Sequence, residues 1–561
     1  MALPAPFEDS PANRAALVRA RDAIGAARAG FEALEAGALA AEDPLEAAAL
    51  ARIAYTYGML EHPGLLASGP LERLLHGLGR EHAGGAVLPG AGAGAAGAPG
   101  RERVLHVATV VYETGGHGRV LERWLERDAV RTPTVLLLKH DEPVPDSLRR
   151  AVAAAGGAFA PSLPAAADLF TKARMLRALA AAHDLVVLHV SNHEVVIPLA
   201  FADPDGRPPT ILCNHASHQL WTGIGCADVV ASLNDFDAAC GVARRGVAPA
   251  RSLVLRAPAA PRALPSREQA RRALGLDPDA PVVLTIASPY KLRAVLEPSW
   301  GDLAAAVLDA APDATLLLVG PSPEDPVAPP AAAGRVRALG RLADVGPQLA
   351  AADLLLDSWP VTGGTTALDA GAAGVPVLAL GNPPPEMVGA PDDLLGGFVA
   401  RAASVGELGE RAAALLADPA ERARLAAAAA DVVAQRHGDG WAAEMEAVVV
   451  AVREHHGAAA PPAEDAALGN PAATRAAAGP GVPAGPPLAG DPAAWEAVIQ
   501  LVRDGHEQGC TPELAYAWNV PELPPARRPR TGAEVVERVA ALRAQAAPAA
   551  SLTRTSSWSR R

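Results

Sequence analysis

The residues best placed to do chemistry form the run Gly363-Gly364-Thr365-Thr366. It follows an apolar stretch, 354–356, and precedes a helix of small residues. Glycines let the backbone approach a ligand closely, Thr365 or Thr366 can cap the helix, and free N–H groups with the helix dipole favour an anion. Asp369, one turn further on, can accept hydrogen bonds from a ribose. The pattern indicates a nucleotide diphosphate site, although a tight turn with an N-cap has the same residue types.

A lysine follows an earlier apolar run in the same half of the chain. The sequence contains three lysines, Lys139, Lys172 and Lys291, because arginine supplies nearly all of its positive charge. Lys291 lies in Ser-Pro-Tyr-Lys-Leu-Arg, directly after the predicted strand 282–288. Its compact ammonium can neutralise a diphosphate leaving group as charge builds up. We assign Lys291 and Arg293 to the same candidate site; the alternative is a solvated surface lysine.

A glycine-rich turn follows the predicted strand 104–112 and contains Gly115, Gly116 and His117. Such turns at the carboxyl end of a first strand line the ligand crevice in open α/β sheets. The G-G-H-G spacing differs from the G-x-G-x-x-G of dinucleotide sites, and no acidic residue follows a second strand at the expected distance. NAD binding is therefore disfavoured. His117 is either a base or a hydrogen-bonding turn residue.

Two further histidines, His215 and His218, follow the predicted strand 210–213. Histidine accepts a proton near neutral pH, so either side chain suits removal of a proton from a hydroxyl, or contact with a substrate. A structural polar loop is the second interpretation. Metal binding is the third, with His117, His189 or His193 as a further ligand, but no recognised metal signature covers these positions. We expect no metal.

The composition excludes several classes of protein. The net charge of -13 argues against a general nucleic-acid binder, which needs clustered Lys and Arg. Four widely spaced cysteines without a C-x-x-C pair argue against a disulfide framework and a zinc site. The sequence shows no signal peptide and no apolar run of membrane-spanning length. We therefore expect a cytoplasmic protein with no transmembrane segment.

From Val104 onward, short continuous apolar runs alternate with helical patterns, which is typical of parallel sheets covered on both faces. The predicted fold is α/β, with two doubly wound, Rossmann-like domains facing a cleft. A helical N-terminal region and a partly disordered C-terminal extension flank them. The predicted boundaries are 1–82 for the helical region, 83–100 for a Gly/Ala/Pro linker, 101–262 and 263–457 for the two domains, 458–490 for a disordered linker, and 491–561 for a short helical tail.

The order of motifs in residues 282–381 resembles the carboxyl-terminal domain of the GT-B nucleotide-sugar glycosyltransferases. The closest likeness is to the O-linked N-acetylglucosamine transferases and the related bacterial adhesin glucosyltransferases. The resemblance implies that Lys291 contacts the donor diphosphate, that Thr365 and Thr366 hold its phosphates, and that Asp369 contacts the ribose. It extends more weakly over 101–456, where His218 lies ten residues before Asp228, as in a segment of this family.

The chain also departs from these families. The O-linked enzymes often have a histidine where this chain has Gly364, no tetratricopeptide array precedes residue 101, and the paired glutamates of many retaining GT-B enzymes are missing. The first departure bears on contacts with the base or the sugar, and the second on recognition of a protein acceptor. The missing glutamates favour inversion at the anomeric carbon.

The implied activity is transfer of a sugar from a nucleotide-diphosphate donor, most consistent with a uridine-linked one, to an unknown hydroxyl or amide acceptor. No cofactor is needed. Gly115, Gly116, His117 and His215 are placed on the acceptor side, with His218 or His117 as the base. The alternatives are a nucleotide-sugar epimerase of the same fold and a degenerate, non-enzymatic scaffold.

Overall fold

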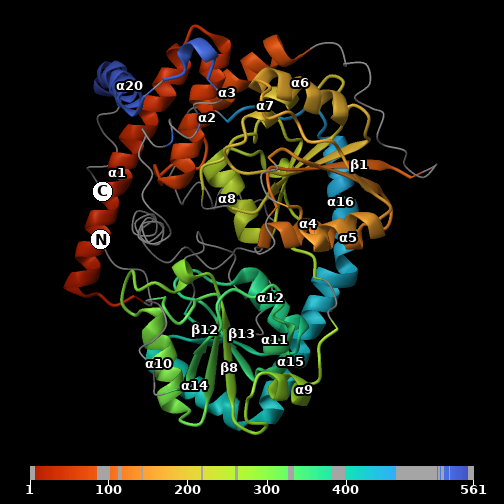
Figure 1. Cartoon of the computed structure of the whole chain (residues 1–561), viewed down its shortest axis with the longest axis vertical. Coiled ribbons are helices and arrows are strands. Elements are labelled where there is room, and N and C mark those ends of the chain that lie inside the picture. Colours follow the sequence, from red (N-terminus) through yellow and green to blue (C-terminus); the bar gives the residue numbers. More distant parts are fainter. Residues whose placement is uncertain are drawn as a thin grey trace.

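The structure is a computed structural model of the 561-residue chain. It describes residues 7–84, 101–111, 116–139, 143–216, 219–259, 263–325, 334–381 and 399–462, together with residues 515, 519, 523–529 and 531–553. Two parallel sheets, each with helices on its faces, form the two halves of the molecule (Figure 1).

The first sheet has seven strands among the described residues, in the order β3-β2-β1-β4-β5-β6-β7, and every neighbouring pair is parallel. The strands are β1 (Arg103–Ala108), β2 (Thr132–Leu137), β3 (Ala158–Phe159), β4 (Leu185–His189), β5 (Thr210–Asn214), β6 (Val229–Ser232) and β7 (Ser252–Val254). The helices between them are α4 (Gly116–Arg127), α5 (Asp146–Ala154), α6 (Leu169–Ala180), α7 (Val196–Phe201) and α8 (Asp235–Arg245).

The second sheet has the order β10-β9-β8-β11-β12-β13 and is also parallel. Its strands are β8 (Val282–Ile286), β9 (Thr315–Val319), β10 (Val336–Ala338), β11 (Leu354–Leu356), β12 (Val377–Leu380) and β13 (Val399–Ala402). Its helices are α9 (Arg267–Ala273), α10 (Trp300–Ala310), α11 (Gly346–Ala351), α12 (Gly364–Ala372), α14 (Val405–Ala417) and α15 (Pro419–Val432). In both sheets the strand order reverses beside the first strand, as in doubly wound folds, so the predicted fold class is confirmed.

The N-terminal region forms α1 (Pro11–Ala40), α2 (Pro44–Leu60) and α3 (Gly69–Leu78). The helix α1 runs along both domains in Figure 1. Ala16, Leu17 and Ala20 near its start join the core of the second domain, whereas Phe31 and Leu34 join the core of the first. The C-terminal helix α20 (Gly532–Thr553) packs against α1. The two ends of the chain thus meet in one helical layer.

The helix α16 (Gly440–Glu454) follows the second sheet in sequence but packs against the first. Its Trp441, Met445 and Val449 share a core with Val104 and Ile211. Sequence reasoning assigned residues up to 457 to the second domain, because order along the chain is all that a sequence gives. The domain boundaries stay a prediction.

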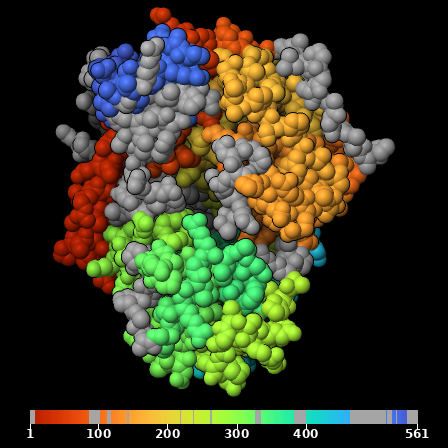
Figure 2. Space-filling model, in the orientation of Figure 1, coloured from red at the N-terminus to blue at the C-terminus, as the bar shows by residue number. Residues whose placement is uncertain are grey.

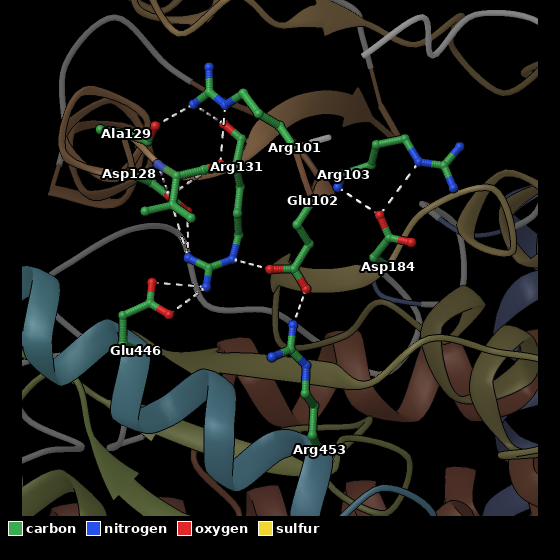
Figure 3. Close-up of polar contacts among 10 residues, drawn as sticks. Arg101, Glu102, Arg103, Asp128, Ala129, Arg131, Asp184, Glu446 and Arg453 are labelled. Atoms are coloured by element: carbon green, nitrogen blue, oxygen red, sulfur yellow. Dashed lines mark hydrogen bonds and ion pairs between the residues drawn. The ribbon is translucent and has the colours of Figure 1, made fainter. Parts of the chain in front are cut away.

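Ion pairs fix α16 at the amino edge of the first sheet (Figure 3). The Arg131 guanidinium lies 2.8 Å from Glu102 and 2.9 Å from Glu446 of α16. Arg453, at the end of α16, pairs with the same Glu102. Arg131 and the side chain of Glu102 are largely buried, so these pairs are less screened than surface pairs.

The remaining predictions about chain organisation fall partly outside the described residues. The predicted linkers lie outside them almost entirely, and so does the first part, 491–514, of the predicted helical tail. Among the residues that the structure describes, no helix is both long and apolar enough to cross a membrane.

Candidate active site

The second sheet positions the candidate site at its switch point, between β8 and β11. Ligands of open α/β sheets bind in the crevice outside the carboxyl ends of the two strands where the order reverses. Lys291 lies in a short 3-10 turn, Pro289–Leu292, directly after β8. The loop 357–363 follows β11 and leads into α12. The topology therefore brings the two predicted motifs to one place.

Lys291 reaches the loop that precedes α12. Its Nζ donates a hydrogen bond of 2.9 Å to the Thr362 carbonyl oxygen. Burial lowers the pKa of Lys291, and the nearby carboxylate of Asp357 opposes that shift. The turn before Lys291 needs Gly320, whose φ is 114°, because a Cβ there would lie 1.9 Å from the Ala287 carbonyl oxygen. Arg293, assigned to the same site, is exposed.

The helix α12 begins differently from the prediction. Its N-cap is Gly363, and no side chain caps it. Thr365 and Thr366 lie inside the first turn, so the expectation that one of them caps the helix is wrong. The Thr366 hydroxyl instead makes a long contact, 3.4 Å, with the Ile286 carbonyl oxygen at the end of β8.

A carboxylate that sequence reasoning did not single out shapes this helix start. Asp357 Oδ1 accepts hydrogen bonds from the Ser358 N–H at 2.8 Å and the Gly363 N–H at 2.9 Å. Burial raises the pKa of Asp357 to about 6, while these N–H groups and the cations of Lys291 and Arg401 oppose the rise. The only sequence signal was an acid directly after a buried strand.

Asp369 lies at the interface of the two domains. Its carboxylate is 3.1 Å from Arg119 and 2.5 Å from Arg123, both on α4 of the first domain. The Asp369 and Arg123 side chains are largely buried. The start of α4 and the start of α12 therefore face each other, with the carboxyl edges of both sheets toward the interface. In Figure 2 the orange first domain and the green second domain meet across the middle of the molecule.

The predicted acceptor-side residues are only partly described. Gly115 and His218 lie outside the described residues, and so does the side chain of His117, although Gly116 begins α4. His215 packs its ring 5.8 Å from that of Trp221.

Asp228, which the resemblance relates to His218, precedes β6 at the amino edge of the sheet. There it forms a buried pair of 2.6 Å with Arg207. It therefore lies at the opposite end of its strand from the interface.

The N-terminal helices hold the loops at the carboxyl edge of the first sheet, which the sequence did not reveal. The Glu72 carboxylate of α3 accepts the N–H groups of Gly223 at 2.6 Å and Gly225 at 3.2 Å. Burial raises the pKa of Glu72, and both N–H groups oppose that rise. The backbone N–H of Trp221 donates to the Leu66 carbonyl oxygen at 3.1 Å. The loop that carries His215 is thus fixed by helices that precede the first sheet.

Within the described ranges, no three His, Cys, Asp or Glu side chains gather in a way that could hold a metal ion. His106 and His189 do meet, at 3.1 Å, inside the first sheet. Burial lowers the pKa of His106 to about 4, so this histidine is neutral near pH 7.

No protein-family model matches the sequence, and no curated protein matches it. Among solved structures, a glycosyltransferase from Rickettsia africae is similar over 64% of this chain and 99% of its own, with a TM-score of 0.50 and 12% identity. HepE of Anabaena, solved with UDP and glucose, is 17% identical over 63% of this chain and 100% of its own, with a TM-score of 0.49. An O-GlcNAc transferase mutant of Thermobaculum terrenum is 20% identical over 74% of this chain and 79% of its own, with a TM-score of 0.46.

Identities this low relate folds and not activities. The strand orders of the two sheets, the facing carboxyl edges and the likeness to the Rickettsia africae structure agree on the architecture. The chain has the two-domain fold of the GT-B glycosyltransferases.

Proposed function

We propose that this chain is a glycosyltransferase. It moves a sugar from a nucleotide-diphosphate donor, uridine-linked, to a hydroxyl or amide acceptor, with inversion and without a metal. The second domain binds the donor and the first domain binds the acceptor.

One observation carries the proposal. The ammonium of Lys291 and the N-terminus of α12 meet at the switch point of the second sheet, joined by the 2.9 Å hydrogen bond to Thr362. A partly buried ammonium beside a helix N-terminus that no side chain caps is a site for an anion. Thr365 and Thr366 in the first helical turn supply hydroxyl groups to the same place.

The chemistry that fits this site is displacement at the anomeric carbon. The acceptor oxygen or nitrogen forms a bond to that carbon while the bond to the diphosphate oxygen breaks. Lys291 and the α12 dipole stabilise the negative charge that gathers on the leaving diphosphate. Removing one such positioned donor commonly costs about 100- to 1000-fold in kcat.

The base is assigned to His218 or His117, as the resemblance suggests. His117 belongs to α4, which follows β1 at the carboxyl edge of the first sheet, and His218 follows β5 in the sequence. That edge faces α12 through the contacts of Arg119 and Arg123 with Asp369. A histidine near neutral pH can accept the proton of the incoming acceptor.

Binding of nucleoside diphosphates tests the donor half of the proposal. The purified chain is heated with UDP, GDP, ADP and CDP, because a ligand that binds only the folded state must raise its Tm. We expect UDP to give the largest rise and Lys291→Ala to reduce it. A chain whose Tm responds to none of the four is not a nucleotide-sugar enzyme.

Incubation with a UDP-sugar in the absence of an acceptor separates transfer from epimerisation. An epimerase needs no second substrate, so a change of sugar configuration under these conditions would replace our proposal. We expect the sugar to be recovered unchanged or released slowly to water.

A further inference from the structure

Asp357 organises the loop on which the proposed donor site depends. It lies directly after β11 and is 4% exposed. One of its carboxylate oxygens, Oδ1, accepts the N–H groups of both Ser358 and Gly363, at 2.8 Å and 2.9 Å. A single oxygen thus closes the loop 358–363 and holds the residue that precedes α12. The same loop offers the Thr362 carbonyl oxygen to Lys291.

The second oxygen of this carboxylate has no hydrogen-bond partner. Asp357 Oδ2 is buried and unpaired within the part of the chain that the structure describes, and so is the hydroxyl of neighbouring Thr362. Buried polar atoms are nearly always satisfied, so an unsatisfied pair beside a helix N-terminus indicates a ligand that completes it. Both groups belong to the loop that leads into α12, where the anion is expected.

Charged groups from two other elements act on Asp357. The ammonium of Lys291 comes from the turn after β8, and the guanidinium of Arg401 comes from β13, where it also binds the Gly381 carbonyl oxygen. Both cations favour the ionised carboxylate, yet burial outweighs them and raises the pKa of Asp357 to about 6. Near neutral pH this carboxylate is ionised but close to its titration.

We propose that Asp357 is a positioning residue that holds the loop and Lys291 in the empty enzyme, and that it takes up one proton on Oδ2 when the diphosphate of a nucleotide sugar binds at α12. This inference rests on the proposed function. The proton comes from solvent, and no bond of the ligand is formed or broken. The neutral acid then accepts N–H groups through Oδ1 and can donate through Oδ2.

Two physical effects drive the uptake. The diphosphate brings negative charge beside a buried carboxylate, and like charges in one site disfavour the ionised form of the weaker acid. Lys291 also becomes shared between the carboxylate and the diphosphate, so it supports ionisation of Asp357 less. Protonation removes the repulsion and leaves the full ammonium charge for the ligand.

Calorimetry with UDP-glucose tests the proposal on the full chain. The diphosphate of UDP-glucose is esterified at both ends, so it lacks the second ionisation of a terminal phosphate, whose pKa is about 6. The ligand itself therefore does not titrate in the pH range of the test. We expect the affinity of the unaltered protein to fall by roughly tenfold per pH unit above pH ~6.5. Titrations at pH 7 in buffers of different ionisation enthalpy should report uptake of about one proton.

Asp357→Asn keeps an oxygen for the two N–H groups but cannot titrate. We expect it to bind UDP-glucose with an affinity that does not change between pH 6 and 8.5, and with no proton uptake. Asp309→Asn is the matched control, because it removes one exposed negative charge from α10 of the same domain. It should retain the pH dependence of the unaltered protein.

The outcomes separate this inference from the proposed function. If the unaltered protein binds UDP-glucose with the same affinity across this pH range and without proton uptake, the role of Asp357 is overturned while the donor site stands. That role is equally overturned if Asp357→Asn keeps the pH dependence. If no variant binds UDP-glucose at any pH, the proposed uridine-linked donor site fails and takes this inference with it. The proton count needs no variant, so it holds even if Asp357→Asn does not fold.

Discussion

Lys291 and Asp357 form the centre of the candidate site, and their environments pull their pKa values in opposite directions. Burial lowers the pKa of the ammonium and raises that of the carboxyl group, while each charge stabilises the other. Placing both in one desolvated pocket is costly unless each is paired. Each charge is therefore tolerated in the protein because the other is present. Removing Lys291 and removing the charge of Asp357 should have different effects.

Lys291→Ala should weaken UDP binding by about 10- to 100-fold, the usual cost of a charge-assisted hydrogen bond. Isothermal calorimetry measures the affinity, and circular dichroism checks that the variant is folded. Lys172→Ala on α6 of the first domain is the matched control among the three lysines and should bind UDP as the unaltered protein does. Equal affinities for the two variants would remove Lys291 from the site.

Asp357→Asn should stabilise the empty protein at pH 7.5. The pKa of Asp357 in the folded protein, about 6, lies above its ordinary value of 3.8, so the folded state holds a proton that the unfolded state has lost between these values. Its contribution to stability is present below pH 3.8 and is lost as the pH rises to about 6. The asparagine of the variant cannot titrate, so the variant keeps this stabilisation at every pH. Above pH 6 its free energy of unfolding should therefore exceed that of the unaltered protein by about 2–3 kcal/mol.

The difference in Tm between the variant and the unaltered protein should be near zero at pH 4 and should grow between pH 4 and pH 6.5. A difference that is constant over this range would show that the pKa of Asp357 is not raised. This measurement uses the empty protein, so it is independent of any ligand.

At the residue scale, the sequence predicted which residues lie at the candidate site better than it predicted their contacts. Lys291 and the glycine-threonine run are found together because both follow strands beside the switch point, and apolar patterns reveal where such strands end. The capping of α12 by a threonine was wrong, because a carboxylate before the loop, Asp357, bonds the N-cap backbone instead. The role of Asp357 depends on a closed loop that no local pattern displays.

At the scale of elements, α4 links the two domains through a row of arginines spaced four residues apart. Arg119 and Arg123 bind the Asp369 carboxylate, and Arg127 donates to the Ala259 carbonyl oxygen at 2.9 Å. Side chains at i and i+4 share one face of a helix. That face of α4 therefore holds both α12 and the segment that connects the domains.

The Asp369 carboxylate shares its acceptor sites with these arginines. If it is the ribose ligand, Arg123→Ala should strengthen UDP binding severalfold and Asp369→Asn should weaken it. Removing Arg123 leaves the carboxylate with one partner fewer and therefore more available to a ribose hydroxyl. Calorimetry with UDP measures both. Arg127→Ala, one turn further along α4, is the control and should leave the affinity for UDP unchanged. If Asp369→Asn binds UDP normally, Asp369 is a contact between domains and not a ribose ligand.

The predicted strands were found where apolar residues follow one another without interruption. The named runs 104–112, 210–213, 282–288 and 354–356 coincide with β1, β5, β8 and β11, because buried parallel strands are continuously apolar. Sequence reasoning did not name β3, β6, β7, β10 and β13, which have two to four residues each. Runs such as Val-Arg-Ala in β10 have no periodicity of their own and become strands only by pairing with a neighbour.

At the scale of the whole molecule, contacts between distant segments decide the arrangement. Sequence reasoning described residues 1–82 as a helical region but gave no reason to place α1 along both domains. The packing of α16 on the first sheet likewise joins the end of the second domain to β1 and β5. Such contacts depend on the shapes of finished domains, which no local spacing encodes.

The start of α1 is anchored to the second domain next to the loop that precedes α12. Asn13 Nδ2 donates to the carbonyl oxygens of Glu8 and Glu297, at 2.9 Å and 2.8 Å, and Asn13 Oδ1 accepts the Glu297 N–H at 3.0 Å. The ring of Phe7 lies 5.1 Å from that of Trp359, in the loop that precedes α12. Because the rest of α1 packs on the first domain, this anchor restrains how the two domains move relative to each other.

Asn13→Ala should therefore loosen the second domain where the donor site lies. It removes the three side-chain hydrogen bonds that tie the start of α1 to Glu8 and Glu297, each worth about 0.5–1.5 kcal/mol. Amide hydrogen exchange should become faster in residues 297–300 and 358–363, with little change in the first sheet, because the anchor contacts only the second domain. Arg14→Ala, the next residue of α1, removes an exposed ion pair with Asp9 and should leave both segments unchanged. If Asn13→Ala exchanges as slowly as the unaltered protein in these segments, α1 rests on the second domain without restraining it.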